Sequence, residues 1–155
     1  MRMFELFDSK FLISDVVHES SMTSYVTFSD SSGAEVMVSF GGFDPLDKGI
    51  YGVCFTRAGK TDKTGDGEEF KIFSTVIEAI DILTAACKPQ VLFFGADISH
   101  GNRSGLYKRM VSKFAHSRGF SIRDITQVDD TLRKIGELFT GEDVTFLISP
   151  SYQTT

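Results

Sequence analysis

The sequence has 155 residues, which is enough for one domain with a sizeable hydrophobic core. Hydrophobic residues make up 41% and charged residues 24%, and this composition excludes an intrinsically disordered chain. The formal net charge of −5 argues against a protein that binds nucleic acid over its whole surface, so any affinity for phosphate has to come from a local patch.

The first sixty residues predict β-strands. A short apolar run covers residues 11–17 and ends at a cluster of Ser and Thr. Apolar residues at 25–28 and 36–40 flank a turn that contains Gly33, a pattern typical of a hairpin. Residues 51–55 alternate between large apolar side chains and smaller or polar ones, which predicts another half-buried strand.

Residues 57–69 are polar and rich in glycine. We interpret them as a mobile loop inside the domain, because too little chain lies on either side to build two separate cores. Gly65-Asp66-Gly67 within this loop lacks the lysine and the spacing of a P-loop.

The second half of the chain changes to helical periodicity. Apolar residues recur on one face over 73–87, and Pro89 ends this helix. Thr75 and Glu78 have the spacing of a capping box, which would place the start of the helix near Thr75. Residues 91–94 are continuously apolar and predict a strand buried on both faces.

Four further segments complete the predicted fold. A helix is expected at 103–118, a strand at 121–127, a helix begun by an aspartate cap at 130–139, and a strand at 144–148. The predicted order, β-β-β-β-α-β-α-β-α-β, indicates an α+β fold with a mixed, mainly antiparallel sheet and three helices packed on it.

We expect residues 1–150 to form a single domain and residues 151–155 to form a flexible tail.

The helix predicted at 103–118 has one apolar face and one basic face. The basic face contains no carboxylate and consists of Lys108, Arg109, Ser112, Lys113 and His116. The apolar face consists of Leu106, Tyr107, Met110, Val111 and Phe114. A face of one sign in a chain of net charge −5 indicates a binding surface for an acidic partner, a phosphate or a polynucleotide, although an ordinary solvated surface would show the same pattern.

Arg103 lies on the apolar side of this helix, one turn before Tyr107. A guanidinium in that position needs a partner, because burying it unpaired would be costly. Three partners remain open: the carboxylate of Asp97, the carbonyl groups of the 91–94 strand, and the anion of a ligand.

The junction before the helix concentrates polar side chains, namely those of Asp97, Ser99, His100 and Asn102. Backbone amides at the start of the following helix are suited to binding an anion. Ser, His and Asp are the residue types of a hydrolytic triad, but neighbours in one loop do not normally reach its geometry. We therefore interpret this junction as a binding site rather than a catalytic one.

Cys54 and Cys87 lie far apart in the sequence, and neither the cysteines nor the three histidines have metal-ligand spacing. We expect two buried free thiols in a reducing compartment and no metal site. The N-terminus lacks the apolar core of a secretory signal, and no apolar run reaches the length of a membrane span. We therefore expect a cytoplasmic protein that does not associate with membranes.

The order of elements from residue 50 onward resembles the C-terminal part of the GNAT-type N-acetyltransferases. The run Asn102-Arg103-Ser104-Gly105-Leu106-Tyr107, followed by Gly119-Phe120, is similar to the helical segment of that family that carries an asparagine and a tyrosine. The resemblance implies acetyl-CoA as the cofactor and Tyr107 as a general acid. The family grips the pyrophosphate of the cofactor with a Gln/Arg-x-x-Gly-x-Gly/Ala loop before a helix, and residues 69–74 and 100–105 do not contain that motif.

A second resemblance connects residues 70–76, together with Arg103-x-x-Leu106-Tyr107-x-Arg109, to small bacteriophage proteins. It implies a phage-encoded accessory factor in the cytoplasm of a bacterial host and carries no activity with it.

We therefore expect a non-catalytic, GNAT-like protein that binds another protein and needs no cofactor. Its predicted binding residues are Asp97, His100, Asn102, Arg103, Tyr107, Lys108, Arg109 and Lys113. The alternative is an atypical N-acyltransferase that uses acetyl-CoA, with Tyr107 as proton donor and a separation of strands near 91–96 holding the thioester. A second alternative is phosphate or nucleic-acid binding through the 103–118 helix, which would weaken steeply with salt.

Overall fold

The structure, a computed structural model, describes residues 11–43, 49–57, 69–96, 102–138 and 143–153. Its strands are β1 (Val17–His18), β2 (Thr23–Ser29), β3 (Glu35–Phe43), β4 (Ile50–Arg57), β5 (Val91–Ala96), β6 (Ser121–Arg123) and β7 (Asp143–Ile148). Its helices are α2 (Glu69–Cys87), α3 (Asn102–Arg118), α4 (Asp130–Glu137) and the short 3₁₀ helix η3 (Ile125–Gln127).

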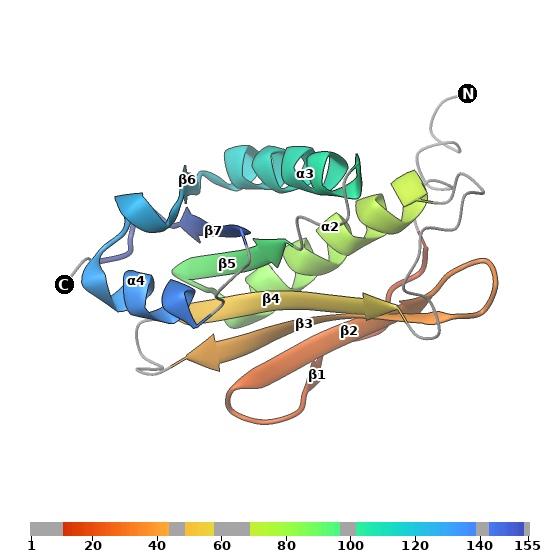
Figure 1. The fold of residues 1–155 in the computed structure, drawn as a ribbon. Coiled ribbons are helices and arrows are strands. Elements are labelled where there is room, and N and C mark those ends of the chain that lie inside the picture. The colour runs from red at the N-terminus through yellow and green to blue at the C-terminus, as the bar shows by residue number, and fades with distance from the viewer. Residues whose placement is uncertain (1–10, 44–48, 58–68, 97–101, 139–142, 154–155) are drawn as a thin grey trace. The chain divides into compact units, whose positions relative to one another are not determined.

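The strands follow one another in the order β1-β2-β3-β4-β5-β7-β6 (Figure 1). The β4–β5 pair is parallel, whereas the β1–β2, β5–β7 and β6–β7 pairs are antiparallel. The predicted α+β fold is therefore confirmed, with its mainly antiparallel sheet, its three α-helices and its order of elements.

Contacts divide the chain into two compact units. Unit 1 consists of Met1–Phe40 and Phe55–Cys87, and unit 2 consists of Gly41–Cys54 and Lys88–Thr155. The chain thus passes from unit 1 to unit 2 within β3 and back again within β4. The expected mobile loop, residues 57–69, falls mostly at positions 58–68, which lie outside the described residues.

In unit 1, the period-2 pattern of β2 and β3 and the helical pattern of α2 bury one set of side chains, and α2 packs against β2. The buried set is Val26, Phe28, Val36, Val38, Phe40, Ile72, Phe73, Val76, Ala79, Ile80 and Leu83. Burying one such large side chain contributes roughly 1.5–3 kcal/mol, so this set is the main source of stability in the unit. The hairpin predicted around Gly33 is confirmed, and Gly33 has the positive φ of 87° that favours glycine.

The predicted start of α2 is wrong. The helix begins at Glu69, so Thr75 lies inside it and is fully buried. The Thr75 hydroxyl donates to the carbonyl of Lys71 (2.8 Å) and accepts from the backbone N–H of Phe11 (2.8 Å), so it holds an earlier segment of chain instead of capping the helix. The Phe11 ring stacks on Phe28, with ring centroids 5.7 Å apart.

Asp30 organises the turn between β2 and β3. Its carboxylate accepts hydrogen bonds from the backbone N–H groups of Ser32 (2.8 Å) and Ala34 (3.0 Å) and from the Ser32 hydroxyl (2.7 Å). Arg57 donates to the second oxygen from Nε at 2.8 Å. Burial raises the pKa of Asp30, but the hydrogen bonds from Ser32, Arg57 and the backbone outweigh burial and lower the pKa to about 2.

In unit 2, α4 covers one side of β5 and β7. The buried cluster there consists of Ile50, Val91, Phe93, Val128, Leu132, Ile135, Val144 and Phe146. Tyr152 packs against this cluster, and its hydroxyl donates to Asp129 (3.0 Å). Burial and this hydrogen bond raise the pKa of Tyr152 to about 12. Residues 154–155 of the expected tail lie outside the described part of the chain.

One predicted boundary in unit 2 is wrong. The strand expected at 121–127 ends at Arg123, because Asp124 caps η3 by accepting from the backbone N–H of Thr126 (2.8 Å). The Gln127 side chain in turn accepts from the Asp124 backbone N–H (3.0 Å). The expected aspartate cap of the next helix is confirmed: α4 begins at Asp130, and Asp129 before it accepts from the backbone N–H of Leu132 (3.0 Å).

Candidate functional site

The parallel pairing of β4 with β5 ends inside both strands. It runs from Ile50 opposite Val91 to Val53 opposite Phe94. Beyond that point β5 continues with β7, where Gly95 lies opposite Val144 and Ala96 opposite Asp143. β5 therefore keeps one neighbour after its ladder with β4 has ended.

Burial changes at the same place. Val91 to Phe94 are all buried, with at most 3% of each residue exposed. Gly95 is exposed, and so is Cys54, the residue that follows the last paired position of β4. These two residues follow the carboxyl end of the parallel β4–β5 ladder, in the middle of the strand order, where side chains are normally covered. We call Val53, Cys54, Phe94 and Gly95 together the β4–β5 opening.

The prediction that both thiols are buried is wrong for Cys54, which is exposed, whereas Cys87 is half-buried. The apolar run around Cys54 suggested a covered strand. Thr56, two residues further along β4, is also exposed, and side chains two residues apart lie on the same face of a strand. Cys54 therefore lies on the exposed face at this end of β4.

Below the opening, β4 and β5 are held rigidly. A Cβ atom added to Gly52 would lie 2.9 Å from Cζ of Phe93, so glycine at this position leaves room for the Phe93 ring to lie over β4. The Phe93 ring is fixed in turn by Phe43 (ring centroids 5.1 Å apart) and by Phe146 (6.0 Å). The β4–β5 opening therefore follows directly on a tightly packed part of the two strands.

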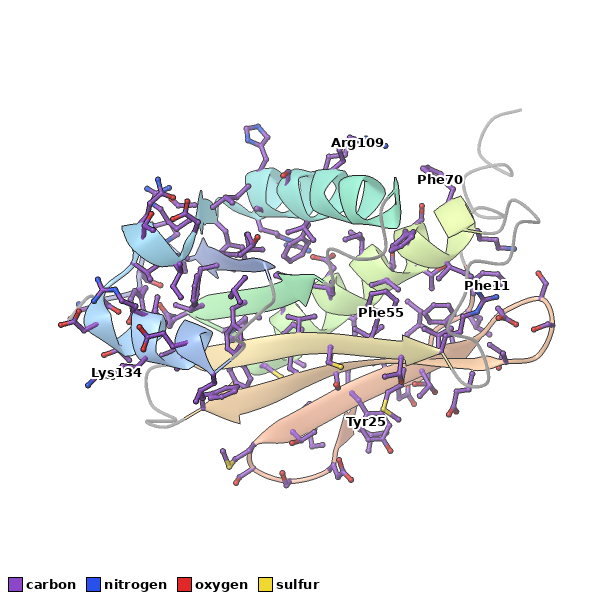
Figure 2. All side chains as sticks on the ribbon, in the orientation of Figure 1. Phe11, Tyr25, Phe55, Phe70, Arg109 and Lys134 are labelled. Atoms are coloured by element: carbon purple, nitrogen blue, oxygen red, sulfur yellow. The ribbon has the colours of Figure 1, made fainter. Side chains whose placement is uncertain are left out.

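The sequence-predicted site residues divide into three groups. Asp97 and His100 lie outside the described residues. Asn102, Arg103, Tyr107 and Lys108 lie in the first part of α3, and their side chains are outside the described set. Arg109 and Lys113 are exposed on α3, whose opposite side buries Val111, Phe114 and Ala115. Figure 2 shows Arg109 on the side of α3 that faces away from β5 and β7.

The start of α2 was predicted too late, so a Gly-x-Gly sequence directly before this helix was not compared with the family motif. With α2 beginning at Glu69, the residues directly before the helix are 62–68, and not residues 69–74. Gly65-Asp66-Gly67 has the Gly-x-Gly spacing of the Gln/Arg-x-x-Gly-x-Gly/Ala motif, and Asp62 stands at the position of its Gln or Arg. This segment lies outside the described residues. The sequence signal was present, since glycines at 65 and 67 precede a stretch without further glycine or proline.

Within the described part of the chain, no helix combines the length and apolar character needed to cross a membrane.

No protein-family model and no curated protein matches the sequence. Solved structures with a similar fold include a variant of spermidine N-acetyltransferase from Vibrio cholerae, at 11% identity and a TM-score of 0.48, over 84% of this chain and 67% of that one. Spermidine/spermine N-acetyltransferase from Vibrio cholerae, in complex with manganese ions, gives 10% identity and a TM-score of 0.46, over 83% of this chain and 65% of that one. Ribosomal-protein-S5-alanine acetyltransferase from Vibrio fischeri gives 12% identity and a TM-score of 0.47, over 98% of this chain and 71% of that one.

The chain thus spans about two thirds of the length of each of these proteins. Identities and TM-scores this low carry no activity over to it. None of the three is described as a bacteriophage protein, so the bacteriophage resemblance stays a prediction.

Proposed function

We propose that this chain is an N-acyltransferase that uses acyl-CoA and binds the acyl-pantetheine arm at the β4–β5 opening. The observation that carries the proposal is the end of the parallel ladder at Val53 and Phe94, followed on both strands by an exposed residue. Ligands of sheets with parallel strands bind outside the carboxyl ends of those strands, where neighbouring strands part.

The chemistry of the arm suits this place. Pantetheine is an extended chain with two amide groups, so it offers the donors and acceptors that a further β-strand would offer. A chain of this kind can lie along the strand segments that follow the ladder. The base formed by Gly52 and Phe93 is packed, so binding would not have to order a flexible strand first.

The reaction would begin when the nitrogen of an amine attacks the thioester carbonyl carbon. The carbon–sulfur bond then breaks, an amide forms, the amine loses a proton and the leaving thiolate gains one. Tyr107 is the proton donor implied by the family resemblance, and its place in α3 directly after the β5 junction is compatible with that role. Its replacement by phenylalanine should lower the turnover of an acyl acceptor and leave acetyl-CoA binding intact.

The pyrophosphate of acyl-CoA requires a second set of contacts. Backbone amides before the first turn of a helix bind phosphate well, and Gly65 and Gly67 precede α2 at the spacing of the family loop. The expectation of a non-catalytic protein rested on the absence of that loop from residues 69–74 and 100–105. With α2 beginning at Glu69, the segment to compare with the motif before this helix is 62–68 instead of 69–74. Asp62 replaces the Gln or Arg of the motif, and a carboxylate near pyrophosphate should weaken the affinity for the cofactor.

Calorimetry with acetyl-CoA tests the proposal directly. We expect binding by the wild type, tighter binding by Asp62→Gln, which restores the motif, and weaker binding by Gly67→Val. Gly41→Ala is the matched glycine control, because a Cβ added at Gly41 meets nothing within 4 Å. The absence of any heat of binding with the wild type and with Asp62→Gln would refute the proposal.

Alkylation of the thiols locates the site independently. Cys54 is exposed and should react with N-ethylmaleimide, and acetyl-CoA should slow that reaction. Cys87, which is half-buried in α2, gives the comparison within the same molecule and should be unaffected. Mass spectrometry of the two labelled peptides distinguishes them. Equal labelling of Cys54 with and without acetyl-CoA, under conditions where calorimetry detects binding, would place the cofactor elsewhere.

A further inference from the structure

The chain concentrates its positive charge in one segment. Residues 102–123 contain six of the 16 Lys and Arg residues and none of the 21 Asp and Glu residues. All the remaining chain therefore carries ten cations against 21 carboxylates, and is strongly acidic. A segment of the opposite sign to the rest of its own protein is a surface on which electrostatics would select a partner.

The structure puts the described cations of this segment on the surface of unit 2. Arg109, Lys113, Arg118 and Arg123 are all exposed, and so is His116. Helical spacing places Arg109, Lys113 and His116 on one side of α3 and Arg118 nearly opposite them. Arg123 lies on β6, which contacts α3. From here on, the name basic face is used for Arg109, Lys113, His116 and Arg123. On the other side of α3, Val111, Phe114 and Ala115 are buried, so this helix cannot turn another face outward without exposing its apolar residues.

We propose that the basic face binds an acidic segment of another polypeptide. This inference does not rest on the proposed acyltransferase activity, because the face is made of α3 and β6 residues and does not include Cys54 or Gly95. Charge complementarity is the main argument for the partner. The face carries two arginines, one lysine and a histidine, and the nearest carboxylate along the chain, Asp124, accepts two hydrogen bonds from Thr126.

Three observations favour a polypeptide over a polynucleotide. The whole chain has a net charge of −5, which repels a polyanion of high charge density. Binding of single-stranded nucleic acid uses exposed aromatic rings for stacking, but in the described part of this segment Phe114 is buried and stacks on Phe120, with centroids 6.1 Å apart. Ile122, next to Arg123 in the sequence, is 40% exposed, and an exposed apolar side chain in a basic segment suits a partner that also carries an apolar residue.

β6 adds a structural reason. It is the last strand in the sheet order, with β7 as its neighbour, so an extended segment can approach its outer edge. The strand has only three residues, which limits pairing to a short stretch and leaves most of the affinity to charge.

The test uses the whole chain, labelled with ¹⁵N, and a synthetic glutamate-rich peptide with one isoleucine in its middle. Titration of the peptide at low salt should shift the amide resonances of residues 109–123 more than those of α4. The matched variants are Lys113→Glu and Lys134→Glu, which make the same charge change at exposed lysines of α3 and α4. Lys113→Glu should weaken binding about three- to tenfold, and Lys134→Glu less than about twofold. Circular dichroism establishes that both variants are folded.

Salt and a second probe complete the test. Affinity for the peptide should fall as salt rises from about 0.01 M to 0.15 M, because the Debye length shortens from roughly 30 Å to 8 Å. Equal effects of the two variants, or shifts that map outside residues 109–123, would overturn the proposal. Tighter binding of a single-stranded oligonucleotide than of the peptide at the same salt would also overturn it, since the partner class would then be wrong.

Discussion

Protonation of Asp30 should remove about 2 kcal/mol of stability. The free energy of unfolding depends on pH wherever the pKa of a group differs between the folded and unfolded states. Asp30 has an ordinary value of 3.8 and a folded value of about 2, and each pKa unit corresponds to about 1.4 kcal/mol. Because the pKa is lowered, the stabilisation is fully present above about pH 4 and is lost as the pH falls through about 2.

The substitution Asp30→Asn isolates this contribution. Asparagine can keep part of the hydrogen bonding to Ser32 and Ala34 but loses the ion pair with Arg57, whose Nη2 lies 2.5 Å from the carboxylate. Above pH 4 the variant should therefore unfold about 2 kcal/mol more easily than the wild type. The difference should shrink towards zero near pH 2, where the wild-type carboxylate also becomes protonated.

Urea unfolding followed by circular dichroism, repeated between pH 2 and pH 7, measures the free energy of unfolding of the wild type and of Asp30→Asn at each pH. Asp15→Asn, at an exposed aspartate, is the control and should change stability by less than about 0.5 kcal/mol. A difference between Asp30→Asn and the wild type that stays constant down to pH 2 would refute the electrostatic explanation. It would mean that shape and packing in the turn, and not the charge of Asp30, stabilise it.

Two further substitutions test the packing of unit 2. Gly52→Ala should destabilise the protein by about 1 kcal/mol, because overpacking against the Phe93 ring costs about 1–3 kcal/mol and removing a strand glycine recovers up to about 1 kcal/mol. A stabilised variant in urea unfolding would contradict this. Tyr152→Phe should cost about 1 kcal/mol at neutral pH through the lost hydrogen bond to Asp129. The pKa of Tyr152 is raised to about 12. The difference in the free energy of unfolding between Tyr152→Phe and the wild type should therefore disappear as the pH rises from 10 to 12. A difference that persists at pH 12 would exclude the hydrogen bond as its cause.

The parts of the fold that local patterns specify could be predicted from the sequence. The β2–β3 hairpin follows from alternation around Gly33, and α3 follows from a helical repeat that ends before Gly119. The start of α2 could not be found in this way. Thr75 has capping chemistry, but a distant backbone group, the N–H of Phe11, takes its hydroxyl, and this contact is invisible in local sequence.

The candidate site was out of reach for a similar reason. Cys54 lies in an apolar run and was expected to be covered, yet it is exposed on the same face of β4 as Thr56. The other mark of the site, the point at which β5 stops pairing with β4, is set by segments about 40 residues apart in the sequence. Periodicity identifies the residues that form strands, but it does not specify how many residues of one strand pair with the next.

The route of the chain has a consequence for synthesis and for attempts to divide the protein. Because unit 2 takes Gly41–Cys54 from the early chain and Lys88–Thr155 from the late chain, neither unit is encoded by one uninterrupted stretch. During synthesis on the ribosome, β4 is made before β5, so the β4–β5 ladder can form only after β5 has been synthesised. A cut between residues 58 and 68 would leave the two halves of that ladder on separate fragments. The two fragments should therefore regain the native circular dichroism spectrum only when mixed, and the rate of recovery should rise with their concentration.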